Sequence, residues 1–260
     1  MPETISLSHQ GLASVVTFTE PPFNVLDIET MENLIAAHRE ADAHPDTRVV
    51  VLRSGLEGMF SNGLNPIKVL DADTQGRIEI FKAVERLVIA LYSLQKPHIA
   101  VLNGPAMAGG AVLAILADFR YMDQDRGAIC FAEAKVGVPV PEGLVAIIAG
   151  VCNPTAMREV VMLGKNMKPQ DALAAGLVDG IAPAGELDAM VEKQVARLSR
   201  LSSDVVKACK FSLRAPILSR ATGILGADGK ATSFTRFVTD EYLGEGLRAF
   251  LEGRQPVFTK

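Results

Sequence analysis

Two adjacent glycines at a predicted strand–helix junction are the residues of this sequence that most clearly suggest a chemical role. Gly109 and Gly110 separate an apolar run at residues 99–102, which predicts a buried strand, from one at residues 111–117, which predicts a buried helix. The first N–H groups of a helix lack internal partners and carry the positive end of its dipole, so they stabilise a ligand oxygen that acquires negative charge. A lone Gly-Gly pair more often serves tight helix–sheet packing, and the chemical interpretation needs a second feature.

A second predicted strand-to-loop junction supplies that feature. Residues 49–52 predict another buried strand, and two junctions of this kind can direct two backbone donors at one oxygen. The sequence has no Gly-x-Ser-x-Gly elbow, and its three cysteines and four histidines have no ligand spacing, so we expect neither a serine-hydrolase triad nor a metal site. The loop after the second strand contains Phe60-Ser61-Asn62-Gly63-Leu64-Asn65-Pro66.

With these two loops, the sequence resembles the crotonase (enoyl-CoA hydratase/isomerase) superfamily. The first signature of that superfamily, F-S-x-G-x-D-[LI], is similar to residues 60–66, although Asn65 stands in place of the aspartate. The second signature, N-G-x-A-x-G-G-G-x-x-[LI], is similar to residues 103–113. Further matches are the K-P-x-I-A lead-in at residues 96–100, Asp118 after the helix, and the F-L-E-x-R-x-P ending at residues 250–256. The ordered set is specific for the superfamily and much less specific for the reaction.

The resemblance implies an α/β fold, a crotonase-like spiral of β-β-α units with a C-terminal α-helical oligomerisation region. We place the spiral core, with its CoA-thioester site, at residues 1–195 and the helical trimerisation region at residues 196–260. The implied assembly is a homotrimer, or a hexamer made of two trimers. The implied substrate is an acyl-CoA thioester of fatty acid metabolism, so coenzyme A enters as part of the substrate and we expect no prosthetic group.

The resemblance also assigns the oxyanion donors. In this superfamily two backbone N–H groups stabilise the thioester oxygen as it becomes enolate-like, and the matching residues are Leu64 and Gly109. Hydratases of the family carry two glutamates, one of them three residues after the oxyanion glycine, where this sequence has Val112. Residues three apart share a helix face, so we expect an apolar side chain where that carboxylate would hold water. Ordinary two-glutamate hydration is therefore disfavoured.

The other glutamate position of the family falls at Glu133, in a segment similar to P-E-x-x-x-G with Ala132 in place of the proline. A single glutamate at this place is the pattern of the Δ3,Δ2-enoyl-CoA isomerases. The resemblance predicts that Glu133 removes a proton from C2 of a 3-enoyl thioester and returns it at C4, while the two N–H groups hold the dienolate. Apolar surroundings, Val112 included, favour a raised pKa of this carboxyl and keep water from adding.

Glu142 leaves other reactions open. Several relatives place a second carboxylate eight residues past the first, which is Pro141 here, and a one-residue loop difference would bring Glu142 into the site. The alternative is an ordinary glutamate at a helix N-terminus, favoured by the helix dipole. A catalytic Glu142 would allow atypical hydration, which is a lyase reaction, or decarboxylation or thioester hydrolysis. A third interpretation is a noncatalytic CoA-binding scaffold.

Further residues are expected to bind the substrate. Phe81, Val84, Leu87 and Val88 have helical spacing and either line an acyl channel or belong to the core. We expect Phe250 to reach the site from a neighbouring subunit. The other expected substrate-binding residues are Val25, Leu26, Ser61, Asn62, Gly63, Gly110 and Val112.

Composition sets limits on partners and location. The 260 residues are 48% hydrophobic and carry a net charge of −4, which suits one enzyme-sized unit and disfavours a nucleic-acid surface. The longest apolar stretch, at residues 106–117, is too short to span a bilayer. Residues 1–6 do not resemble a leader, and residues 258–260 are not a peroxisomal address, so we expect a cytoplasmic enzyme.

The elements that position these residues follow from pattern and capping. A hairpin, a helix capped by Asp27 and then alternating strands and helices predict a layered α/β core, with a more helical second half after Gly137. We expect strands near residues 4–8, 13–18, 48–52, 98–102 and 177–181, extended segments within 121–131, and helices near 75–95, 109–117, 144–151, after Asn153, at 169–175 and beyond 186 with an interruption at 226–229.

Overall fold

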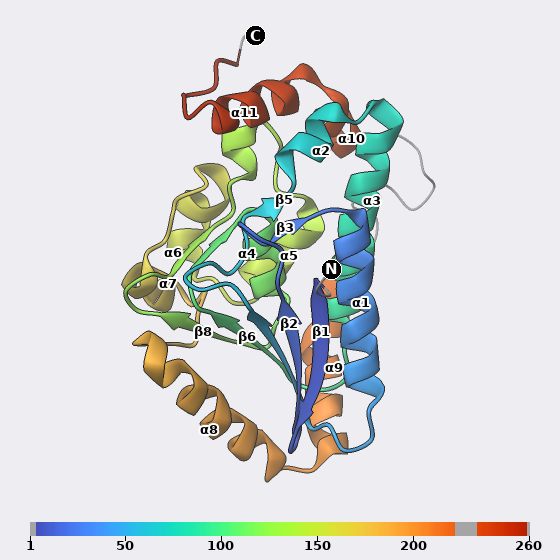
Figure 1. Ribbon diagram of the computed structural model, residues 1–260, viewed down its shortest axis with the longest axis vertical. Helices are drawn as coiled ribbons and strands as arrows, with labels where there is room; N and C mark the ends of the chain where they lie inside the picture. Colours follow the sequence, from blue (N-terminus) through green and yellow to red (C-terminus); the bar gives the residue numbers. More distant parts are fainter. Residues whose placement is uncertain (1–3, 222–232, 259–260) are drawn as a thin grey trace.

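A six-stranded sheet forms the centre of the protein (Figure 1). The computed structural model describes residues 4–221 and 233–258. The first two strands of the sheet are antiparallel and every later pair is parallel. In spatial order the strands are β1 (Ile5–Gln10), β2 (Ala13–Phe18), β4 (Val49–Ser54), β6 (His98–Leu102), β8 (Phe119–Asp123) and β10 (Gly180–Ala182).

A second, smaller layer of strands lies across the ends of the main sheet. Each short strand follows one strand of the main sheet, and a helix follows most of the short strands, so the chain repeats strand, strand and helix. This repeat confirms the expected crotonase-like spiral of β-β-α units. The short strands pair as β3 (Val25–Leu26) with β5 (Gly63–Leu64) and as β7 (Pro105–Met107) with β9 (Ala128–Cys130), and a bridge between Ser61 and Ala106 connects the two pairs.

Side-chain caps fix where the early helices begin. Asp27 caps α1 (Ile28–Ala43) and accepts the N–H of Thr30, as its place in the sequence predicts. Asn65 caps α2 (Pro66–Asp71), which starts with proline at its first position. Asp73 caps α3 (Thr74–Tyr92). The replacement of aspartate by Asn65 therefore keeps a capping side chain at the end of the loop that contains residues 60–65.

The two faces of the main sheet are buried by different helices. Because side chains alternate along a strand, one set faces α1, α3 and α4 (Gly109–Ile115), and the other set faces α8 (Leu187–Ser199). The larger core cluster, on the first face, includes Val16, Val50, Leu52, Ala100 and Leu102. The smaller cluster under α8 includes Val15, Val51, Ile99, Val101 and Val191.

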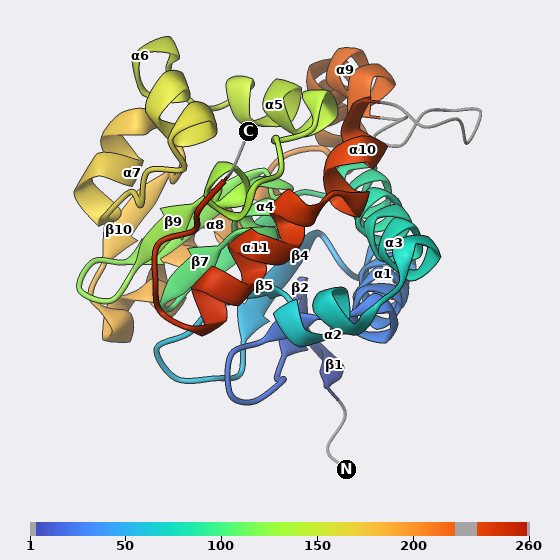
Figure 2. The ribbon, with the colours of Figure 1, turned by 90° about the horizontal axis from the view of Figure 1, so that it is seen from above.

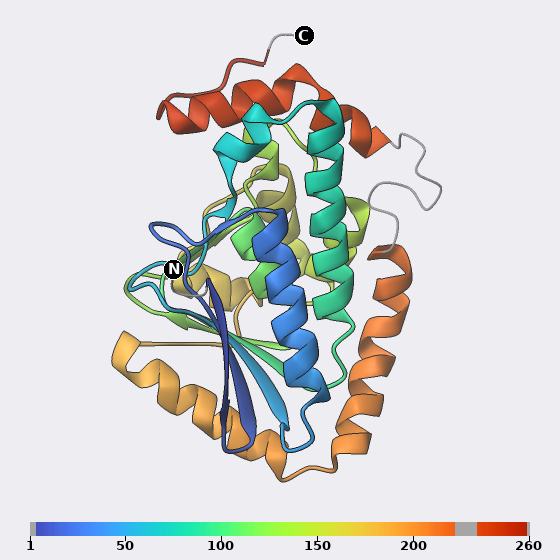
Figure 3. The same ribbon diagram turned by 45° about the vertical axis from the view of Figure 1, so that its right-hand side comes forward.

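The second half of the chain is mostly helical, as expected. Its helices are α5 (Glu142–Ala149), α6 (Pro154–Met157), α7 (Pro169–Ala175), α8, α9 (Ser203–Ala221), α10 (Ser233–Thr239) and α11 (Glu241–Leu251). The division that we placed between residues 195 and 196 falls inside the continuous helix α8, so no break in the chain lies there. Helices α10 and α11 lie at the end of the molecule opposite to α8 (Figure 3). The interruption expected at residues 226–229 lies outside the described residues.

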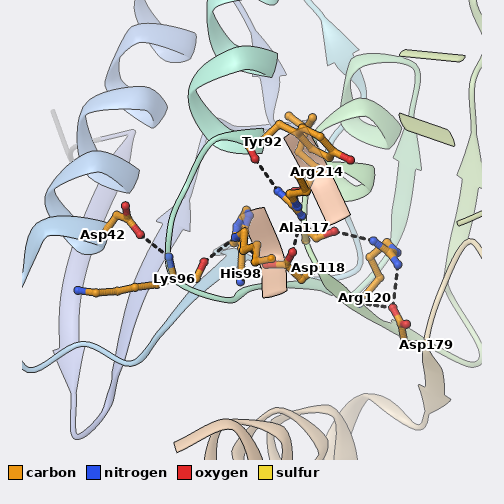
Figure 4. Close-up of polar contacts among 11 residues, drawn as sticks. Asp42, Tyr92, Lys96, His98, Ala117, Asp118, Arg120, Asp179 and Arg214 are labelled. Carbon is orange, nitrogen blue, oxygen red and sulfur yellow. Dashed lines mark hydrogen bonds and ion pairs between the residues drawn. The ribbon is translucent and has the colours of Figure 1, made fainter. Parts of the chain in front are cut away.

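A buried ionic cluster attaches α9 to the core (Figure 4). Lys210 and Arg214 of α9 each lie 2.7 Å from an oxygen of Asp118, the residue directly before β8. Arg214 also donates to the carbonyl of Tyr92 and lies over its ring, while Lys210 donates to the carbonyl of Lys96. Burial lowers the pKa of Lys210 to about 8, although Asp118 favours its charged form. Asp118 is therefore an anchor for the C-terminal part of the chain.

Within the part of the chain that the structure describes, no helix is both long and apolar enough to cross a membrane. The same residues contain no group of three or more His, Cys, Asp or Glu side chains that could hold a metal ion.

Candidate active site

An apolar cavity lies where the short strands, α4 and the C-terminal helices meet. Its walls come from elements far apart in the sequence, and α11 crosses above α4 and β7 when the molecule is viewed from above (Figure 2). Among the described residues that line it, Glu133 alone carries an ionisable side chain. The lining consists of Asn62, Leu64, Pro66, Val69, Phe81, Val84, Met107, Ala108, Gly109, Val112, Ala132, Glu133, Val136, Val138, Pro139, Pro141, Leu144, Phe234, Leu243, Leu247 and Phe250.

The two expected oxyanion donors meet at one side of this cavity. A Cβ atom placed on Gly109 would lie only 3.3 Å from the amide nitrogen of Leu64, and one placed on Gly63 would lie 2.6 Å from the amide nitrogen of Gly109. Gly63 has a φ of +82°, which glycine adopts without strain. Gly109 is the first residue of α4, so its N–H has no acceptor within that helix. The two loops thus bring their backbone amides together, as the signatures imply.

Ala108 sets the direction of the second amide. Its φ of 46° and ψ of −117° are unusual for a residue with a side chain, and its own N–H donates to the carbonyl of Cys130 at 2.7 Å. Such backbone strain persists only where the surroundings hold it, and it is typical of sites that position a group. The strained residue comes directly before Gly109, at the point where the chain turns from β7 into α4.

Val112 lies one turn further along α4. Its side chain is 3% exposed and lines the cavity, so it presents methyl groups at the position where a second carboxylate would otherwise stand. The structure places Val112 where the helical spacing predicts.

Glu133 enters the cavity from a short turn. It begins the 3-10 helix η1 (Glu133–Val136), which follows β9 and ends at Gly137 in a left-handed conformation with a φ of 80°. The N–H groups of Gly137 and Val138 both donate to the carbonyl of Glu133, which fixes the turn. The Oε2 atom of Glu133 is shielded from solvent and has no hydrogen-bond partner among the described residues.

Burial dominates the electrostatics of this carboxyl. It raises the pKa of Glu133 from 4.5 to about 7, opposed only by a hydrogen bond from the residue's own N–H. Buried polar atoms are nearly always hydrogen-bonded, so an unpartnered carboxyl oxygen that faces an apolar cavity indicates a functional group. A carboxyl with a pKa near neutrality can both accept and return a proton.

Glu142, the second candidate base, lies outside the cavity. It is the first residue of α5, its side chain is exposed, and the cavity lining passes from Pro141 to Leu144 without it. Its place is that of the ordinary helix N-terminal glutamate, favoured by the helix dipole. The loop before α5 does not bring Glu142 to the side of Glu133.

The expected substrate-binding residues divide into three groups. Asn62, Val112 and Phe250 line the cavity. Ser61 and Gly110 support it instead: Ser61 is fully buried and donates to the carbonyl of Asn24, and a Cβ on Gly110 would lie 2.2 Å from the carbonyl oxygen of Ser61. Gly110 therefore provides close packing between the two loops. The remaining residues lie beside the donors without lining the cavity, since Val25 and Leu26 pair with Gly63 and Leu64.

The acyl-channel candidates divide into two groups. Phe81 and Val84 line the cavity, whereas Leu87 and Val88 are buried in the main core. Phe250 lines the cavity of its own chain, where we expected a contribution from a neighbouring subunit. The sequence pattern did not indicate Phe234, Leu243 and Leu247 of α10 and α11, nor Pro139, as lining residues. The amphipathic pattern of α11 was the available signal, but it does not indicate which surface the helix covers.

Comparison with known proteins agrees with this geometry. The sequence matches the family described as enoyl-CoA hydratase/isomerase over residues 8–260. It is 25% identical to human mitochondrial enoyl-CoA delta isomerase 1 over 240 residues, which cover 92% of this chain and 79% of the relative. It is 27% identical to the carnitinyl-CoA dehydratase of Salmonella heidelberg over 265 residues, which cover 99% of both chains.

The fold has a close counterpart among solved structures. The crystal structure of human mitochondrial delta3-delta2-enoyl-CoA isomerase superposes with a TM-score of 0.90 at 23% identity, over 96% of this chain and 98% of the other. The relatives include both isomerases and a dehydratase, so they share the acyl-CoA chemistry and differ in the reaction. Because the family match extends over nearly the whole chain, this protein belongs to the enoyl-CoA hydratase/isomerase family of enzymes.

Proposed function

We propose that the protein is an acyl-CoA isomerase that moves the double bond of a 3-enoyl-CoA to the 2-position. The observation that carries the proposal is the isolation of Glu133, the only ionisable side chain among the described residues that line an otherwise apolar cavity. A hydration reaction needs a second polar group to hold and activate water. Val112 occupies the position of that group on α4.

In the proposed mechanism one carboxylate performs both proton transfers. Glu133 takes a proton from C2, the electrons of the C2–H bond form the dienolate, and negative charge develops on the thioester oxygen. The N–H groups of Leu64 and Gly109 stabilise that oxygen, and preorganised donors of this kind contribute about 3 kcal/mol each to the transition state. The protonated Glu133 then returns the proton at C4, which leaves the double bond between C2 and C3. The elevated pKa of Glu133 suits both directions of transfer.

The alternative reactions have less support. Atypical hydration, decarboxylation or thioester hydrolysis would need Glu142, which is exposed and does not line the cavity. A noncatalytic CoA-binding scaffold would gain nothing from a desolvated carboxyl beside two backbone donors, and leaving such a group without a partner costs stability.

Two substrates and two matched variants test the proposal. Purified protein is incubated with 3-hexenoyl-CoA and with 2-hexenoyl-CoA, and the absorbance of the conjugated thioester is followed. We expect conversion of the 3-enoyl substrate without hydration of the 2-enoyl substrate. Glu133→Gln should lower the rate by at least about a hundredfold, the usual contribution of a general base, while Glu142→Gln should leave it unchanged. Hydration of 2-hexenoyl-CoA by the unmodified protein would contradict the proposal.

We also propose that the protein forms a homotrimer or a dimer of trimers. Three large apolar side chains of α9 are strongly exposed in the single chain: Val205 at 60%, Phe211 at 72% and Leu213 at 75%. Such side chains are available for apolar contacts between subunits. Light scattering coupled to size-exclusion chromatography should give three or six times the chain mass of 27.7 kDa. A mass of one chain would contradict this assembly.

A further inference from the structure

Helix α11 contacts the active site with two different faces. Leu243, Leu247 and Phe250, spaced by four and three residues, line the cavity. Tyr242 and Gly246, spaced by four residues, instead lie against the turn that carries Glu133. The helix that lines the cavity therefore also packs directly on the turn of the proposed base.

Gly246 makes the closest approach between α11 and this turn. A Cβ atom at residue 246 would lie 2.4 Å from both the Cα and the carbonyl oxygen of Val136, and 2.5 Å from its carbonyl carbon. These are backbone atoms, so no rotamer change can relieve the overlap. Carbon atoms in contact prefer separations of about 3.5 Å or more, so a side chain here would force the helix and the turn apart by about 1 Å.

A second glycine makes the reciprocal approach from the turn. A Cβ atom on Gly137 would lie 2.8 Å from the carbonyl oxygen of Tyr242 and 3.0 Å from the ring of Phe258. The rings of Tyr242 and Phe258 pack edge to face, with their centroids 5.8 Å apart. The turn is therefore enclosed between α11 and the segment that follows it.

An ion pair holds that segment on α11. Arg254 donates to both carboxylate oxygens of Glu245, at 2.5 and 3.0 Å, and Glu245 also accepts the N–H of Val257. The hydrogen bond from Arg254 lowers the pKa of Glu245 to about 2, so the pair stays charged throughout the working pH range. This contact places Phe258 against Tyr242.

We propose that Gly137 and Gly246 are positioning residues for Glu133: by letting α11 and its C-terminal segment close on the turn, they hold the carboxyl in the cavity and away from water. The inference rests on the proposed function of Glu133 as the proton carrier. It assigns to the two glycines a part in catalysis although neither lines the cavity. Separation of α11 from the turn would admit water beside Glu133 and make its position less defined.

The titratable groups around Glu133 lie on its own segment and on α11. Cys130 and Lys135 are the nearby titratable groups on its own segment, and burial raises the pKa of the Cys130 thiol. Helix α11 carries Glu241, Tyr242, Glu245 and Arg248, none of which lines the cavity. Desolvation is the dominant cause of the elevated pKa of Glu133, so partial solvation returns that pKa toward 4.5.

The test compares two glycines of the same helix. Gly246→Ala should lower kcat at least about tenfold and move the acid limb of the rate profile down by at least about half a pH unit, because water then reaches the carboxyl. Gly244→Ala is the matched control. The three atoms nearest to its Cβ would belong to the guanidinium of Arg248, at 3.3 Å and beyond. This flexible group can move aside, so kcat and the pH profile should stay as they are in the unmodified protein.

A third variant covers the case in which Gly246→Ala does not fold. Phe258 is 42% exposed, so Phe258→Ala should fold and loosen the same contact. We expect a smaller shift of the pH profile in the same direction. Unchanged profiles in the folded variants would overturn the inference.

Titration of the carboxyl separates this inference from the proposed function. In protein labelled with 13C at the glutamate carboxyl, the signal missing from Glu133→Gln identifies Glu133, and its pKa is measured without any substrate. A lower pKa in Gly246→Ala than in Gly244→Ala supports positioning even if the unmodified protein fails to isomerise 3-hexenoyl-CoA. Equal pKa values in both variants would overturn the inference whatever the activity.

Discussion

The pH dependence of isomerisation follows from the environment of Glu133. Burial raises the pKa of this carboxyl to about 7, and the mechanism requires the deprotonated form to start the reaction. With that pKa, about 9% of the carboxyl is deprotonated at pH 6 and about 91% at pH 8. We therefore expect kcat to rise about tenfold from pH 6 to pH 8, with its midpoint near pH 7.

The measurement is the initial rate with saturating 3-hexenoyl-CoA at pH values from 5.5 to 8.5. The phosphates of coenzyme A titrate in part of this range, so the series is repeated with the pantetheine thioester, which lacks them. Glu142→Gln is the control and should give the same profile, because Glu142 is exposed and outside the cavity. A rate that stays constant from pH 5.5 to pH 8, or a midpoint below pH 5.5, would refute the assignment of a desolvated base.

Three further predictions concern the cavity and the fold. Val112→Glu should lower isomerisation at pH 7 at least about tenfold, because a second carboxylate disfavours the charged form of Glu133; the same absorbance assay measures it, and an unchanged rate would contradict the close placement of the two. Asp118→Ala should destabilise the protein by about 3–5 kcal/mol in urea unfolding, because the buried Arg214 and its neighbouring lysine lose their counter-charge; a loss below about 1 kcal/mol would show that α9 is held otherwise. Burial lowers the pKa of His38 to about 4 from 6.5, so its contribution to stability is present above pH 6.5 and is lost as the pH falls toward 4. Between pH 7 and pH 5 this loss is about 2 kcal/mol, and His38→Phe should lack it in urea unfolding at the two pH values; an equal loss in both proteins would contradict the assignment.

The sequence could indicate that the expected oxyanion donors and the proposed base lie at one cavity, because the resemblance to the family rests on short motifs that contain these residues. The chain around Leu64, Gly109 and Glu133 adopts strand-to-loop junctions whose geometry depends on nearby residues. The start of α2 also has a local signal, because an asparagine followed by proline, as at Asn65 and Pro66, is typical of a helix start.

The rest of the site depends on contacts between distant segments. Whether Glu142 enters the cavity is decided by the path of residues 138–141, and spacing along the chain does not determine that path. The amphipathic helix α11 could cover its own chain or a neighbour, and both placements bury the same face. Its place over the cavity depends on the fit of Gly246 against Val136, which the sequence pattern does not reveal.

The central claim is that one carboxyl moves the proton from C2 to C4. We would measure it with 3-hexenoyl-CoA that carries deuterium at C2, by following the position of the label in the 2-hexenoyl-CoA product and comparing the protein with Glu133→Gln. The account predicts that part of the deuterium appears at C4 and that Glu133→Gln loses at least about a hundredfold in rate. Full activity of Glu133→Gln, with the label still transferred, would contradict the account.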